Sequence, residues 1–175
     1  MKKDFYGNPF RLLWYGKRAL LQSYLWVFWL LVIALQIIVF SKWPDKIDLT
    51  RFSLQSLFTP SLTGLTFTLA LFVAEKNIFN REELYRLATY KNDRRKEGSA
   101  LMELLAPFLF TAILFLITGV TSLLGQFVIW NISVKNVCDR LLVCAFIDVL
   151  LLALLSLFGL IVTTLNDAYL SAKRK

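Results

Sequence analysis

One carboxylate, Asp148, stands in a long stretch of the sequence that otherwise carries no charge. It follows Arg140 by about 12 Å along a helix that rises about 1.5 Å per residue. A carboxylate at that depth in a bilayer is costly unless it is protonated, paired or in contact with water. Two interpretations follow. Asp148 is either a proton, ion or gating site, or a structural hydrogen-bonding group that meets Ser and Thr on neighbouring helices.

Small and polar residues recur at helical spacing around Asp148 and on two other apolar stretches. Helix faces of this kind let backbones pack closely in a membrane. Alternatively, their hydroxyls from several copies of the chain line a water-filled axis. One such stripe comprises Ser56, Thr59, Thr63, Thr66, Ala70 and Ala74, and another comprises Thr111, Thr118, Ser122 and Gly125. The candidate intramembrane polar site comprises Asp148, Cys144, Ser156, Thr163, Thr63, Thr66, Thr118 and Ser122.

The residue types that most catalytic and metal sites need are scarce. The sequence has no His, and its two cysteines, Cys138 and Cys144, match neither a zinc pattern nor a disulfide framework. Phosphate-binding loops, nucleophile elbows and paired intramembrane acids are also missing from the sequence. We therefore expect a protein that is not an enzyme, with no catalytic residues, no metal and no cofactor.

Four apolar stretches must position these side chains. Hydrophobic residues make up 57% of the 175 residues and aromatic residues 15%, more apolar surface than a soluble domain buries. Each stretch is long enough for a helix to cross about 30 Å of hydrocarbon. The stretches cover residues 19–41, 52–74, 104–130 and 141–166. The sequence predicts an all-α, four-span transmembrane helix bundle, with residues 1–175 as one membrane domain in a lipid bilayer and an aromatic first span that mostly faces lipid.

The positions of the charges predict the orientation. The formal net charge is +8, and 15 of the 20 Lys and Arg residues lie in the two tails and in the loop 75–103. Such a bias marks the cytoplasmic side of a membrane protein. We expect both termini in the cytoplasm. The segment Phe10–Tyr15, which follows an Asn8-Pro9 start signal, is expected to form a helix in the headgroup layer.

The loop 75–103 is the largest soluble element of the predicted topology. Asn80 fits the cap of a short helix, and Gly98-Ser99 fits the break before the third span, so we expect a cytoplasmic helical hairpin here. The basic run Arg94-Arg95-Lys96 in this loop is suited to anionic lipid, a negatively charged partner or nucleic acid. The excess of Lys and Arg that marks the cytoplasmic side would also produce such a run without any binding function. The candidate partner-binding or lipid-binding residues are Arg81, Arg86, Lys91, Arg94, Arg95 and Lys96.

The compact four-span layout, the cytoplasmic termini and the charged helical loop from Asn80 to Gly98 resemble the membrane subunit of the bacterial Kiwa anti-phage defence system. The resemblance covers the whole chain through layout and size, and it transfers no functional residue. It implies an oligomeric sensor in the bacterial inner membrane that works with a cytosolic, nucleic-acid-binding partner protein. This chain itself is not expected to bind nucleic acid directly.

Three functions are consistent with these patterns. The first is a self-associating membrane anchor or sensor that docks a cytosolic protein on the loop 75–103. The second is an oligomeric channel or pore-forming effector with Asp148 and the Thr-rich second span along its path. The third is a proton-coupled transporter that uses Asp148.

Overall fold

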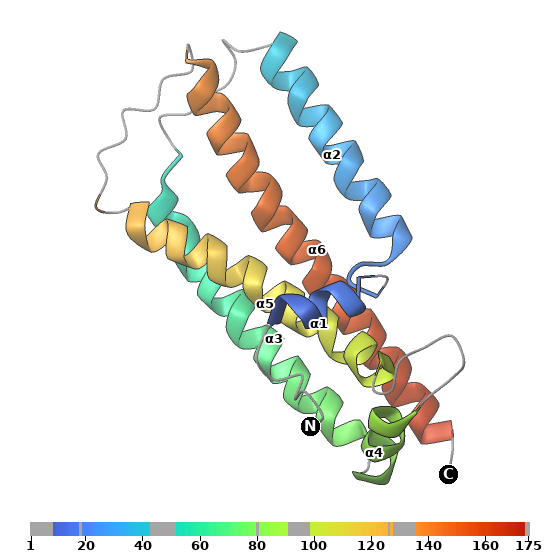
Figure 1. Ribbon diagram of the computed structural model, residues 1–175. Helices are drawn as coiled ribbons and strands as arrows, with labels where there is room; N and C mark the ends of the chain where they lie inside the picture. Colours follow the sequence, from blue (N-terminus) through green and yellow to red (C-terminus); the bar gives the residue numbers. More distant parts are fainter. Residues whose placement is uncertain are drawn as a thin grey trace.

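Every regular element in the described part of the chain is a helix, as the sequence predicts. The computed structural model describes residues 9–17, 19–42, 52–79, 81–90, 99–125, 127 and 136–173. Figure 1 shows the order of the elements. They are α1 Pro9–Tyr15, α2 Ser23–Lys42, the 3-10 turn η4 Leu54–Leu57, α3 Phe58–Ile78, α4 Arg81–Thr89, α5 Ser99–Gly125 and α6 Val137–Lys173.

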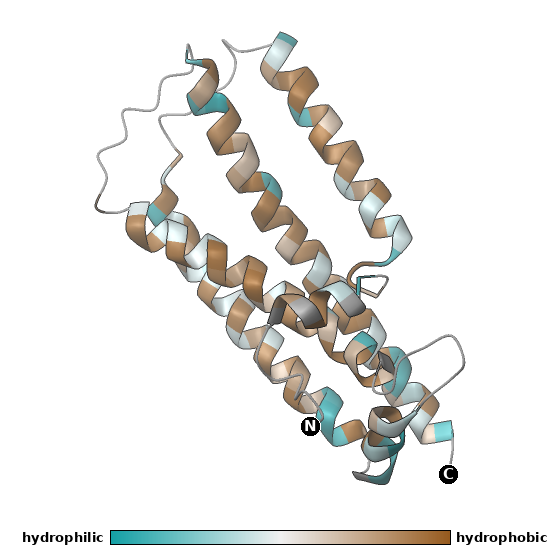
Figure 2. Cartoon of the chain, viewed as in Figure 1, coloured by the Kyte–Doolittle hydropathy of each residue, from teal (hydrophilic) through white to brown (hydrophobic). Residues whose placement is uncertain are grey.

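Four of these helical segments are long and apolar enough to cross a membrane. They are Ser23–Lys42, Leu54–Ile78, Ala100–Gly125 and Val137–Lys173. Hydrophobic residues run along these segments, whereas hydrophilic ones gather on α4 and at the carboxyl end of α6 (Figure 2). In α2 only Leu25 is buried. Such apolar surface on all sides of a helix is stable in lipid and unfavourable in water, which indicates a multi-pass membrane protein.

The helix ends follow from local chemistry. Pro60 lies in the first turn of α3, where a backbone N–H has no helical partner to lose. The side chain of Asn136 accepts a hydrogen bond of 3.2 Å from the backbone N–H of Cys138 and caps α6. With 37 residues, α6 is about 55 Å long and exceeds the hydrocarbon thickness. It runs beyond both ends of the stretch 141–166.

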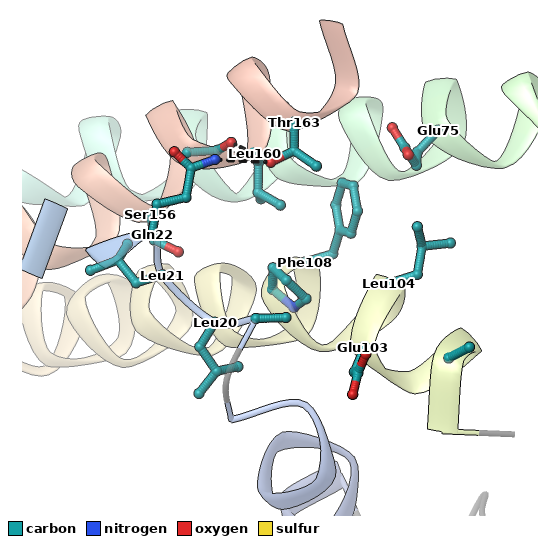
Figure 3. Close-up of a pocket in the computed structure, with 14 residues that line it drawn as sticks. Leu20, Leu21, Gln22, Glu75, Glu103, Leu104, Phe108, Ser156, Leu160 and Thr163 are labelled. Atoms are coloured by element: carbon teal, nitrogen blue, oxygen red, sulfur yellow. Dashed lines mark hydrogen bonds between the residues drawn. The ribbon is translucent and has the colours of Figure 1, made fainter. Parts of the chain in front are cut away.

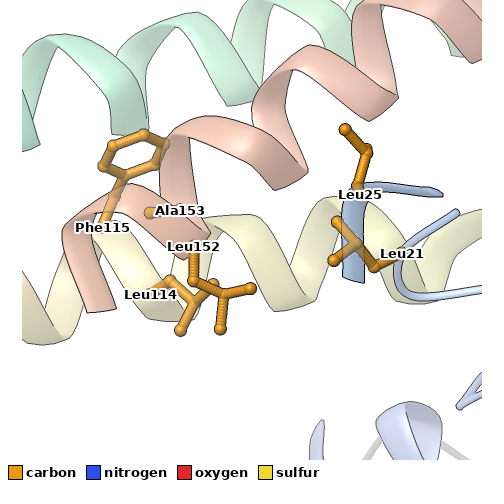
Figure 4. Packing of buried hydrophobic residues seen from close by; sticks show 6 residues of the cluster. All are labelled: Leu21, Leu25, Leu114, Phe115, Leu152 and Ala153. Atoms are coloured by element: carbon orange, nitrogen blue, oxygen red, sulfur yellow. The ribbon is translucent and has the colours of Figure 1, made fainter. Parts of the chain in front are cut away.

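Helices α3, α5 and α6 pack against one another, while α2 lies along α6 and α1 lies on α5 (Figure 1). A buried cluster ties the start of α2 to the middle of α5 and α6 (Figure 4). Its members are Leu21, Leu25, Leu114, Phe115, Leu152 and Ala153. α2 therefore joins the rest of the bundle through its contacts with α6.

The predicted amino-terminal helix is present as α1. Gly16, directly after it, sits so close to Ala106 of α5 that a Cβ at position 16 would overlap the Ala106 side chain. Phe10 and Trp14 are mostly exposed, and the Lys17 ammonium lies 4.9 Å from the centre of the Trp14 ring. An exposed aromatic surface beside a cation is suited to the headgroup layer, which is where the sequence predicts this helix.

Part of the predicted hairpin lies outside the described residues. α4 begins at Arg81 and α5 begins at Ser99, in agreement with the start signals at Asn80 and Gly98-Ser99, although residues 80 and 91–98 are not described. α4 packs on α5. The cytoplasmic placement of this region remains a prediction.

Gly64 of α3 provides a stability test of the α3–α5 packing. A Cβ at position 64 would come within 2.7 Å of Cδ1 of Phe115 and closer still to Cε1 and Cζ. Phe115 is 1% exposed and has no room to move. Gly64→Ala is therefore expected to lower the free energy of unfolding by about 1 to 3 kcal/mol, as overpacking does. Thermal unfolding of the purified protein in detergent measures the effect.

Gly119 of α5 is the matched control. A Cβ there would meet the Cβ of Ser61 at 3.5 Å, an ordinary contact. Since Ala also favours the helix over Gly, Gly119→Ala should leave the melting temperature unchanged or raise it. Equal melting temperatures for the two variants would contradict the close packing of Phe115 on Gly64.

Candidate functional site

Asp148 meets a side chain of the first long helix. With its carboxamide oriented to donate, Gln36 of α2 places Nε2 at 2.5 Å and 3.1 Å from the two carboxylate oxygens of Asp148. The carboxylate is half-buried and lines a cavity of about 400 Å³ between α2 and α6. A hydrogen bond to a carboxylate offsets part of the cost of burying it.

Further polar contacts hold α2 along α6. Trp29 donates from Nε1 to the backbone oxygen of Asp148 at 3.1 Å, and Gln22, just before α2, donates to the hydroxyl of Thr163 at 3.4 Å. Arg140 donates from Nη1 to the backbone oxygen of Phe40 at 3.0 Å. Phe40 lies in the last turn of α2, where carbonyls lack helical donors. Arg140 therefore caps α2. As the residue number rises along α2, the number of its partner on α6 falls, so the two helices are antiparallel.

Cys144 lies one helical turn before Asp148 and lines the same cavity. Its thiol is free and partly buried. It is thus a neighbour of the Asp148–Gln36 pair, on the side of α6 that faces α2. Among the described residues, no group of three or more acidic or cysteine side chains is placed to hold a metal ion.

A second polar region lies among α3, α5 and α6. The hydroxyls of Thr111 and Ser156 are 2.6 Å apart, and Thr111 also donates to the backbone oxygen of Pro107 at 2.9 Å. Because a hydroxyl has one hydrogen, Ser156 is the donor to Thr111. Thr118 donates to backbone oxygens of its own helix, and both Thr118 and Ser122 are fully buried. These hydroxyls allow close helix packing.

Thr63 and Thr66 lie elsewhere, on the outer face of α3. Both are exposed, as are all members of the stripe that comprises Ser56, Thr59, Thr63, Thr66, Ala70 and Ala74. We call it the outer stripe. The opposite face of α3 carries the buried residues Ser61, Gly64, Thr68 and Glu75. The chain therefore packs α3 through one set of small residues and leaves the outer stripe without a neighbour among its own described residues.

The predicted polar site therefore divides into three places. Asp148, Cys144 and Thr163 face α2 or its approach. Ser156 meets Thr111, while Thr118 and Ser122 are buried elsewhere along α5. Thr63 and Thr66 are exposed on α3. Of the basic residues, Arg86 lies exposed on α4 and Arg81 begins that helix. The side chain of Arg81 and the residues Lys91, Arg94, Arg95 and Lys96 lie outside the described part of the chain.

Two important residues were not among the predicted site residues. Gln36 is a carboxamide well inside the apolar first stretch, whereas Gln22 lies near its start, and a carboxamide at this position is the signal for a polar contact there. The first span is mostly exposed, as expected, but it also supplies the partner of Asp148. Glu75 is the second omission: it stands directly after the second stretch and was assigned to the soluble loop, yet it is only 2% exposed.

The contact between Gln36 and Asp148 can be measured by a double-mutant cycle. Gln36→Leu leaves the carboxylate without this donor, and Asp148→Leu leaves the carboxamide without its acceptor, whereas the double variant removes both groups. We expect each single change to destabilise the protein. The double change should be less harmful than the sum, with a coupling energy of about 0.6 to 2 kcal/mol.

Equilibrium unfolding in mixed micelles, with far-UV circular dichroism as the readout, measures the four proteins of the cycle. Asp148→Asn is the matched control because an amide oxygen still accepts from Gln36. Strict additivity of the two single changes would show that the two side chains do not interact.

No known protein family, curated protein or solved structure matches the chain. The resemblance to the Kiwa membrane subunit accordingly remains a prediction from layout.

Proposed function

We propose that the chain is a non-enzymatic multi-pass membrane protein that self-associates through α3 and holds a cytosolic protein partner at the membrane. The observation that carries the proposal is the outer stripe of η4 and α3, whose side chains are small, bear a hydroxyl in four of six positions, and are all exposed. Lipid chains make few contacts with such small side chains, so this surface gains little packing energy when it faces lipid. A second helix gains close packing from the same surface.

The opposite face of α3 strengthens this argument. Gly64 and Thr68 already pack α3 against its own bundle, so the outer stripe is not needed for the fold of one chain. The hydroxyl of Thr66 donates to the backbone oxygen of Leu62 at 3.0 Å, which satisfies its hydrogen without a neighbour. The stripe is therefore tolerable in lipid and becomes favourable when a second copy covers it.

The partner would dock on the loop between α3 and α5. The excess of Lys and Arg in the tails and in this loop supports a cytoplasmic position for it. α4 presents Tyr85, 70% exposed, beside the exposed Arg86, and Tyr and Arg are enriched where proteins bind one another. The Kiwa-like layout supports a role as an inner-membrane sensor in anti-phage defence, with a partner protein in the cytosol.

A pore is the second candidate, because the hydroxyls of Thr63 and Thr66 would line the axis of an assembly built on the outer stripe. Asp148 lies toward α2 rather than on this stripe, so the pore would lack the carboxylate. The Gln36 contact likewise gives Asp148 a structural role that needs no proton-coupled transport. Conductance in planar bilayers distinguishes a pore from an anchor.

Cysteine crosslinking tests self-association. In a Cys138→Ser, Cys144→Ser background, Thr66→Cys should form a covalent dimer on mild oxidation in native membranes, since two copies would bring this position together at the stripe. Leu154→Cys, on an exposed face of α6, is the matched control and should stay monomeric. Gel mobility reads the result. A Thr66→Cys protein that crosslinks no more than the control would contradict association through α3.

Charge reversal tests the docking surface. Arg94→Glu, Arg95→Glu and Lys96→Glu together should reduce recovery of a co-purifying cytosolic protein by about tenfold, since reversed charges repel an acidic partner surface. The matched control reverses Lys173, Arg174 and Lys175, which gives the same charge change on the carboxyl-terminal tail. Quantitative mass spectrometry of the purified complexes measures recovery. Equal partner recovery from both variants would place docking elsewhere.

A further inference from the structure

A cavity of about 370 Å³ lies where the segment before α2 crosses α3, α5 and α6. Figure 3 shows the walls: Leu104 and Phe108 come from α5, Ser156, Leu160 and Thr163 from α6, and Leu20 from the segment before α2. Its volume is at the small end of the range of ligand sites in proteins. The walls are mainly apolar with a few polar groups, as in such sites.

The polar groups in this cavity attract cations. Glu75 of α3 supplies a carboxylate, and Gln22, Ser156 and Thr163 supply neutral oxygens. Glu103 of α5 also lines the cavity but has an interaction of its own. No Lys or Arg is among its described lining residues. The ring of Phe108, which is 6% exposed and packs edge-to-face with Phe72, adds apolar surface to the wall. A cavity lined in this way is unfavourable for anions.

Glu75 is the group that points to a ligand. Its side chain is 2% exposed, and neither carboxylate oxygen accepts a hydrogen bond of good geometry from the described residues. Its polar neighbours are Thr164 and Asp167 of α6, and the buried hydroxyl of Thr164 also lacks a hydrogen-bond partner there. Lys76 lies beside Glu75 along a separate cavity of about 190 Å³ and forms no hydrogen bond with it. A buried carboxylate without a donor is strongly unfavourable unless it is protonated or a cation binds it.

We propose that this cavity binds a primary ammonium group with a short apolar body, and that Glu75 is its counter-ion. A primary ammonium supplies three donors to the oxygens of Glu75 and the hydroxyls nearby, while Leu104, Phe108 and Leu160 cover the apolar part. Two kinds of molecule provide a primary ammonium group: a free amine and the headgroup of an ethanolamine lipid. The cavity lies where α3 ends and α5 begins, near the bundle end that would face lipid headgroups. The site does not depend on self-association or on a partner protein.

The test compares hexylammonium with hexanol, which has the same chain and no charge, on the purified full-length protein in phosphatidylcholine nanodiscs. Hexylammonium should raise the melting temperature and hexanol should not. Isothermal titration should show that Glu75→Gln weakens hexylammonium binding by about tenfold or more, because a charge-assisted hydrogen bond is lost. Glu82→Gln, on the exposed surface of α4, is the matched control and should bind as the wild type does.

A second variant keeps the test valid if Glu75→Gln folds poorly. Ala100→Leu fills the cavity from α5, keeps Glu75 and should also abolish binding. Nanodiscs that contain phosphatidylethanolamine separate the two sources. If this lipid suppresses hexylammonium binding, the headgroup is the occupant, and if it has no effect, the occupant is a soluble amine. Equal binding of hexanol, full binding by Glu75→Gln, or no binding of hexylammonium to the wild type would each overturn the proposal.

Discussion

Polar groups in the long helices must find partners inside the protein, because lipid offers none. α6 meets this requirement on two sides at once. Toward α2 it presents Asp148 and Arg140, which engage Gln36 and the last turn of α2. Toward α5 it presents Ser156, which donates to Thr111. The arrangement of the other helices around α6 follows from these two sets of contacts together with the apolar cluster between them.

The attachment of α2 to α6 shows that apolar and polar contacts have different roles. Only Leu25 of α2 is buried, so apolar packing fixes this helix at one end only. Farther along, Trp29 and Gln36 bond to α6, and Arg140 caps the final turn. Lipid competes well for apolar surface and poorly for hydrogen bonds. The polar pairs therefore set the register of α2 on α6, while its exposed apolar side meets the bilayer.

The sequence predicted the helices well and their neighbours poorly. Hydrocarbon thickness imposes a minimum length and an apolar composition, and four stretches met both conditions. Their ends were harder to predict because charged residues continue a helix without penalty outside lipid, as α6 does up to Lys173. A helical wheel placed Thr63 and Thr66 on one face but contained no information on whether that face packs within the chain. Similarly, the spacing around Asp148 defined a face without identifying α2 as the helix opposite it.

The carboxylates of Asp148 and Glu75 differ in their burial and in their partners. Asp148 has a carboxamide from α2 against both of its oxygens, so its burial is explained by the fold alone. Glu75 is more deeply buried and has no such donor among the described residues, although it lines a cavity whose other polar groups are oxygens and one carboxamide. If the side chain at position 75 served stability alone, burying Gln or Leu there would cost less free energy than burying a carboxylate. The proposed cation in the cavity beside Glu75 would supply the missing partner, at the end of the bundle where α3 meets α5.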